Sequence, residues 1–156
     1  MSDPARAHLL ETWQSCQQAV AWLRRSFDKS PLPPYAEVSA DDWDQLEALS
    51  GRFARLTDLI VHKLLRALDR YEFEQTGSLL DAANRAVKRG LIESTSELRD
   101  IKDIRNEIVH EYAIDDLCGL YADIHRATPR LLFLVERIQV YLEQTHGFAP
   151  KGIIKT

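Results

Sequence analysis

The chain has 156 residues, of which 45% are apolar and 28% are charged, and its formal net charge is −4. This length and composition exclude a disordered chain, and they predict one domain, residues 1–156, with a hydrophobic core of its own. The negative charge argues against a protein that binds nucleic acid over its whole surface, because such binding depends on neutralising phosphates. Any contact with nucleic acid would therefore be local.

No apolar run reaches the roughly 18 residues that a membrane helix needs, and Met1–Pro4 lacks the basic and then apolar plan of a secretory signal. We therefore expect a cytoplasmic protein without membrane contact. The two cysteines, Cys16 and Cys118, lie far apart and have no zinc-site spacing. We expect both to be buried free thiols, and we expect neither a metal nor a cofactor.

Helical periodicity runs through most of the chain and predicts an all-α fold, an up-and-down bundle of about five helices. The first helix should begin near Asp3 and Pro4, which suit a cap and a first turn. Its core seam recurs at alternating steps of three and four residues: Trp13, Cys16, Val20, Leu23 and Phe27. The proline-containing stretch 28–42 has no period and predicts a long irregular connection.

A second, continuous helix is predicted from about residue 42 to residue 71. Its seam comprises Leu46, Leu49, Phe53, Leu56, Ile60, Leu64, Ala67 and Tyr71, and a second apolar strip comprises Val61, Leu65 and Leu68. Asp58 lies beside that second strip. It would be either a buried partner for an arginine or an exposed carboxylate at the edge of the strip.

Three further helices are expected after a break at Gly77 and Ser78. A short one covers residues 78–89 and closes at Gly90, and the next begins near residue 95. The last covers about residues 115–144, and Thr128-Pro129 predicts either a kink in it or a restarted helix capped by Thr128. The tail, residues 147–156, has no period and should be irregular.

The octapeptide Arg105-Asn106-Glu107-Ile108-Val109-His110-Glu111-Tyr112 is where the chain carries candidate chemistry. Arg105 falls inside the apolar stripe of its helix, where a guanidinium must find carboxylate, backbone or phosphate partners. His110 lies about 140° around an ideal helix from Arg105. A working Arg–His site would therefore need either a helix distortion near His110 or a second subunit.

Arginine and histidine are the residue types that RNA cleavage without a metal requires. Neutral His110 would accept the proton of a ribose 2′-hydroxyl, and Arg105 would stabilise the charge on the transition state, leaving a 2′,3′-cyclic phosphate. Asn106 would hold a phosphate oxygen or orient the histidine, and Tyr112 would bind or stack near the RNA. Glu107 would raise the imidazole pKa if it lies close.

A purely structural interpretation of the same residues stays open. Arg105 would then pair with an acidic residue such as Asp58, His110 would be an exposed polar residue, and Tyr112 would be a core aromatic with a hydrated hydroxyl.

The octapeptide resembles the RX4HXY motif of the HEPN superfamily, in particular the HepT-like toxins, and the order of helices extends the resemblance loosely to residues 5–145. The resemblance implies a homodimer formed through the motif surface and a metal-independent endoribonuclease, cutting tRNA or mRNA, with Arg105 and His110 catalytic. It also implies a partner, an MNT-type nucleotidyltransferase antitoxin that attaches AMP to Tyr112 and so blocks RNA access. The alternative is a non-catalytic helical adaptor, or substrate-binding partner, of a nucleotidyltransferase.

Overall fold

The computed structural model describes residues 3–75, 77–110 and 117–149, and within these ranges it is helical without strands. Its elements are α1 (Pro4–Lys29), α2 (Ala40–Asp58), the π-helical segment η1 (Leu59–Leu64), α3 (Leu65–Tyr71), α4 (Leu79–Lys88), α5 (Thr95–His110) and α6 (Leu117–His146). Because α2, η1 and α3 follow one another without a break, the described ranges form five helical rods. This confirms the predicted all-α bundle of about five helices.

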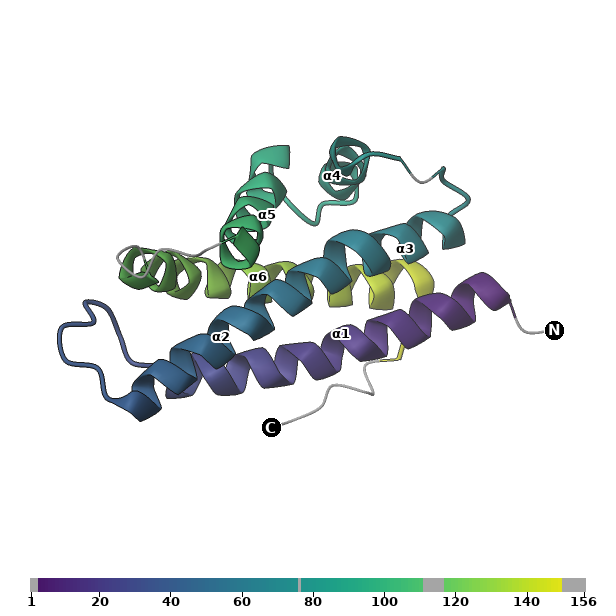
Figure 1. Ribbon diagram of the computed structural model, residues 1–156. Helices are drawn as coiled ribbons and strands as arrows, with labels where there is room; N and C mark the ends of the chain where they lie inside the picture. Colours follow the sequence, from purple (N-terminus) through teal and green to yellow (C-terminus); the bar gives the residue numbers. More distant parts are fainter. Residues whose placement is uncertain (1–2, 76, 111–116, 150–156) are drawn as a thin grey trace.

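Helices α1 and α2 run side by side in opposite directions (Figure 1). The side chain of Asp3 caps α1 by accepting from the Ala5 N–H at 2.9 Å. The connection is shorter than the predicted 28–42, since α1 continues to Lys29 and α2 already begins at Ala40. The reason is a capping box, in which Ser39 and Asp42 each accept from the other's backbone N–H.

The predicted seam of the second rod is buried from Leu46 to Ala67, and its second apolar strip is buried as well. The rod is nevertheless not a plain α-helix. The N–H of Leu65 donates to the carbonyl of Ile60, five residues back, so the segment Leu59–Leu64 has π-helical bonding. Hydrophobic periodicity cannot reveal such a segment, because the apolar positions on either side still face the core.

Helix α4 begins with a second capping box, formed by Ser78 and Asp81, and is followed by Gly90 at φ +77°. Both features agree with the predicted short helix. An ion-pair network attaches α4 to α3, because the buried carboxylate of Asp69 accepts from Arg85 at 3.0 Å and from Arg89 at 2.7 Å.

Helix α6 passes through Pro129 as one helix, so the predicted restart at Thr128 is wrong. Thr128 is fully buried, and its hydroxyl donates to the carbonyl of Ile124 at 2.7 Å instead of capping a new helix. The helix ends before Gly147, at φ +68°, and Phe148 folds back into the core beneath the Arg6 guanidinium, 4.5 Å from the ring centre. The described start of the tail is therefore irregular, as predicted, but packed.

The two cysteines differ in exposure. Cys16 is buried in the core, and burial raises the pKa of its thiol to about 12. Cys118 is exposed near the start of α6, so the prediction of two buried thiols is wrong for this residue. None of the described helices has the length and apolar character that a membrane span requires.

Candidate functional site

Helix α5 carries the Arg105–His110 part of the octapeptide and packs against both α2 and α6. Its inward residues Leu98 and Ile101 are buried, and Ile104 is partly buried one turn later. Arg105 follows in the same stripe, with 23% of its side chain exposed. The predicted position of Arg105 at the edge of the core is therefore observed.

Asp58, the last residue of α2, is the partner of Arg105. Its two carboxylate oxygens accept from Arg105 Nε at 2.7 Å and from Nη2 at 2.9 Å, a bidentate arrangement. Of the two interpretations of Asp58, the arginine partner is the observed one, although 37% of its side chain remains exposed. Because both groups reach solvent, the pair contributes only about 1 kcal/mol to stability, and its main effect is to fix the direction of the guanidinium.

Asn106 adds a third contact, since its Oδ1 accepts from Arg105 Nη1 at 3.3 Å. A guanidinium has five N–H donors, and the hydrogen bonds to Asp58 and Asn106 account for three of them among the described residues. One N–H of Nη1 and one N–H of Nη2 are thus left without a partner among the described residues. Guanidinium N–H groups are donors that recognise phosphate oxygens.

His110 is exposed at the last described residue of α5, which is α-helical up to that point. The described residues show no hydrogen bond or ion pair joining His110 to Arg105, or Glu107 to His110. The structure thus places Arg105, Asn106 and Asp58 together and leaves His110 and Glu107 apart from them. Tyr112 lies outside the described residues.

The sequence prediction missed a second histidine beside Arg105. His62, in η1, lies with its Nε2 2.8 Å from Lys102 Nζ and 4.0 Å from Asp58 Oδ1, the same oxygen that Arg105 Nε binds. The pKa of His62 is lowered, first by burial and then by Lys102, with Arg66 and Arg105 adding to the effect and Asp58 opposing it. The available signal was the four-residue step from Asp58 to His62, which puts both on one helix face.

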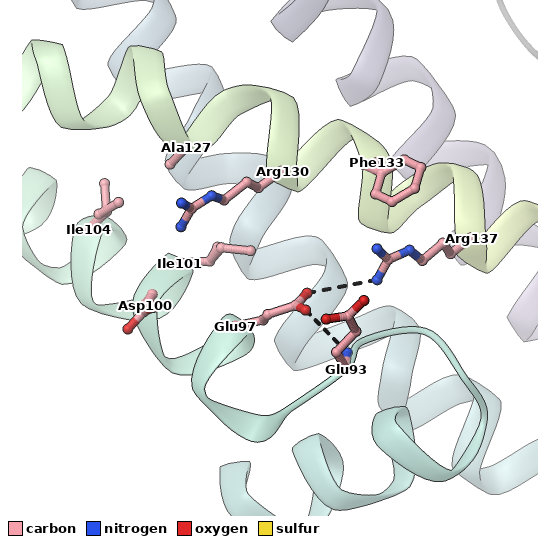
Figure 2. A pocket seen from close by; sticks show the side chains of 9 residues that line it. All are labelled: Glu93, Glu97, Asp100, Ile101, Ile104, Ala127, Arg130, Phe133 and Arg137. Carbon is pink, nitrogen blue, oxygen red and sulfur yellow. Dashed lines mark hydrogen bonds and ion pairs between the residues drawn. The ribbon is translucent and has the colours of Figure 1, made fainter.

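On its other flank, α5 forms a cavity of about 270 Å³ with α6 (Figure 2). Glu97 accepts there from the Glu93 N–H at 3.1 Å and lies 3.8 Å from Arg137, which stacks over Phe133 at 4.1 Å. Figure 2 shows Arg130 reaching over Ile101 toward the space between the helices. Three carboxylates and two guanidinium groups line this cavity, so it lacks the excess of positive charge that a phosphate would need.

No protein-family model matches the chain, and neither a curated protein nor a solved structure is significantly similar to it. The resemblance of the octapeptide to the HEPN motif therefore stays a prediction. Within the residues that the structure describes, no group of three or more histidine, cysteine, aspartate or glutamate side chains is arranged to hold a metal ion. The chemistry available beside Arg105 is that of fixed cations, an imidazole and a carboxylate.

Proposed function

We propose that the protein is a metal-independent endoribonuclease toxin of the HEPN type, acting on cytoplasmic tRNA or mRNA, in which Arg105 and His110 are catalytic. The observation that carries the proposal is the Arg105 guanidinium, which Asp58 holds through Nε and Nη2 while two of its five N–H groups have no partner among the described residues. A cation fixed in this way can stabilise a phosphorane without reorganising during the reaction.

The proposed reaction is a transfer within the RNA. His110 accepts the proton of the 2′-hydroxyl, the 2′-oxygen attacks the phosphorus, and the bond from phosphorus to the 5′-oxygen breaks. The leaving 5′-oxygen takes a proton from solvent or from the site. The products are a 2′,3′-cyclic phosphate and a free 5′-hydroxyl, and no metal or oxidant takes part.

The direction of His110 supports a site made by two copies of the chain. Lys102, Asn106 and His110 recur every four residues and so form one stripe along α5, beside the exposed Val109. In a symmetric dimer, this stripe can pack antiparallel against the same stripe of the partner subunit. If the two-fold axis passes midway between positions 105 and 110, His110 of the partner subunit lies at the same height as Arg105. The sequence leaves two ways to bring the residues together, a helix distortion near His110 or a second subunit. The second subunit agrees better with a helix that is regular up to His110.

The first experiment replaces His110 by alanine, with His8→Ala, an exposed histidine on α1, as the matched control. Growth arrest and cleavage of a labelled RNA should disappear in His110→Ala and persist in His8→Ala, while circular dichroism shows the same helix content in both. If His110→Ala is as toxic as the parent, the catalytic assignment is wrong.

A mixing experiment tests the shared site. Arg105→Ala and His110→Ala are each inactive alone, but a heterodimer of the two would contain one complete site if each site uses both chains. Random reassociation should then recover about a quarter of the parent activity, since half of the dimers are mixed and each has one of two sites. No recovery, with mixed dimers verified by mass spectrometry, would mean that one chain supplies both residues.

We further propose that an MNT-type nucleotidyltransferase neutralises the protein by adenylylating Tyr112. The phenolic oxygen would attack the α-phosphorus of ATP, pyrophosphate would leave, and the phenolic proton would pass to solvent. The added nucleotide would bring negative charge and bulk to the proposed active site and so repel RNA. Intact-mass measurement after co-expression should show AMP-sized increments that vanish in Tyr112→Phe, and their persistence would exclude this site.

The second candidate is a non-catalytic adaptor, or substrate-binding partner, of a nucleotidyltransferase. This candidate is favoured by the separation of His110 from Arg105 within one chain, because a docking surface does not require the two side chains to act on the same phosphate. It predicts a dimer and modification of Tyr112, but no RNA cleavage by any variant, so the His110 experiment separates the two.

A further inference from the structure

Asp58 lies between basic side chains that come from two different parts of the chain. His62 lies one turn after Asp58 on the second rod, while Lys102 and Arg105 lie one turn apart on α5. His62 Nε2 contacts Lys102 Nζ at 2.8 Å, and the same Oδ1 of Asp58 lies 4.0 Å from His62 and 2.7 Å from Arg105. These contacts bring His62, Lys102 and Arg105 together on the surface where η1 meets α5.

The charges that act on His62 do not balance. Lys102, Arg66 and Arg105 act on it as cations, and Asp58 is the opposing carboxylate. The ammonium of Lys102 can only donate a hydrogen bond, so the 2.8 Å contact requires His62 Nε2 to be the unprotonated acceptor. Three cations against one carboxylate leave an excess of positive charge near His62, and an anion bound beside His62 and Lys102 would reduce it.

The backbone at this point is unusual as well. His62 belongs to η1, the π-helical segment of the second rod. Such segments are rarer than α-helix and recur at functional sites, because they change the direction of a few side chains within a helix. About half of the His62 side chain, 48%, is exposed, so an anion in solution can reach it.

We propose that the side chains of His62, Lys102 and Arg105, where η1 meets α5, bind one phosphate of an RNA backbone, with Arg105 using N–H groups that neither Asp58 nor Asn106 occupies. The identification of that phosphate as part of RNA rests on the proposed function, whereas phosphate binding itself does not. His62 and Lys102 are then substrate-binding residues of the same site, outside the octapeptide. The phosphate replaces the contact between them, and both groups turn toward it.

Inorganic phosphate is the first probe, because it tests binding without any cleavage. The imidazole resonances of His62 are assigned by comparison with His62→Gln and titrated with pH by NMR. Without phosphate, His62 should titrate below 6.5, the ordinary value for histidine. Saturating phosphate should raise its pKa by about one unit, since an anion in contact stabilises the imidazolium. An unchanged His62 titration would overturn the proposal.

The second measurement uses an oligonucleotide that cannot be cleaved because each ribose carries a 2′-O-methyl group. Lys102→Met should weaken its binding by about tenfold at low salt, and Lys63→Met, the matched loss of one exposed charge in η1, should weaken it far less. Equal effects of the two substitutions would mean that only the overall charge matters and would overturn the phosphate site.

Cleavage assays separate this proposal from the proposed function. If the parent protein cleaves no RNA while phosphate still shifts the His62 titration, the ribonuclease proposal fails and the phosphate site stands. If the parent cleaves RNA and neither Lys102→Met nor His62→Gln raises KM relative to Lys63→Met and His8→Gln, the phosphate site fails alone. A rise in KM with little change in kcat supports a binding role.

Discussion

Replacement of Asp69 by asparagine should strongly destabilise the fold. Asp69 is 1% exposed, and its carboxylate accepts from Arg85 at 3.0 Å and from Arg89 at 2.7 Å. The asparagine keeps the size but loses the charge, so two guanidinium groups remain beside a neutral amide. Loss of one partner from a buried ion pair costs about 3–5 kcal/mol.

The expected magnitude is at the lower end of that range. Glu72 still accepts from Arg89 at 3.2 Å, and 22% of the Arg85 side chain is exposed, so each arginine keeps some compensation. We therefore expect a loss of about 3 kcal/mol in the free energy of unfolding. For a chain of this size the melting temperature should fall by roughly 6–12 °C.

Urea denaturation followed by circular dichroism at neutral pH measures the change. Asp103→Asn is the matched control, because Asp103 is exposed on α5, and its effect should stay within about 0.5 kcal/mol. A loss below about 1 kcal/mol in Asp69→Asn, with the control unchanged, would mean that Asp69 does not compensate two buried guanidinium groups. It would show that solvent reaches the two arginines once the carboxylate is gone.

Three further measurements test the fold. Gly51→Ala, inside α2 with open space around the new methyl group, should raise the unfolding free energy by about 0.5–1 kcal/mol, and a lower urea midpoint would contradict the described helix. Phe53→Ala, at a fully buried ring, should cost about 3–5 kcal/mol in the same assay, and a change under 1 kcal/mol would place the ring at the surface. Burial raises the pKa of Glu72, but hydrogen bonds from Tyr141, His146 and Arg89 outweigh it, and the net shift is downward from 4.5. The stabilisation from Glu72 is thus complete above pH 4.5 and is lost as the pH falls through the folded-state pKa, so Glu72→Gln should flatten the acid limb of a stability profile.

Local signals in the sequence account for most of the helices. The start of α4 after Ser78 and its end at Gly90 follow from a capping serine and a residue that tolerates positive φ. Such signals depend on residues within one or two turns, so they can be recognised without knowing the fold. The same holds for the place of Arg105 in the apolar stripe of α5, which periodicity alone predicts.

Local signals misled where tertiary contacts compete with them. Thr128-Pro129 predicts a kink or a restarted helix, and the restart is the part that is wrong: the continuous helix buries Ile124, Thr128 and Leu131, and that burial offsets the backbone bond that proline removes. Cys118 is predicted to be buried because free cysteines usually are, but it is exposed beside the first residue of α6, so residue type alone does not predict its exposure.

Periodicity and capping signals predict the helices, the core stripes, and an arginine and a histidine that point in different directions from one helix. What surrounds that arginine depends on tertiary packing. Asp58 lies 47 positions before Arg105 in the chain, and His62 lies 40 positions before Lys102. Helical periodicity specifies which face of a helix is buried but not which helix covers it, and the π-helical turn at His62 leaves the apolar pattern unchanged. The partners of Arg105 are therefore a property of how α2, η1 and α5 pack together.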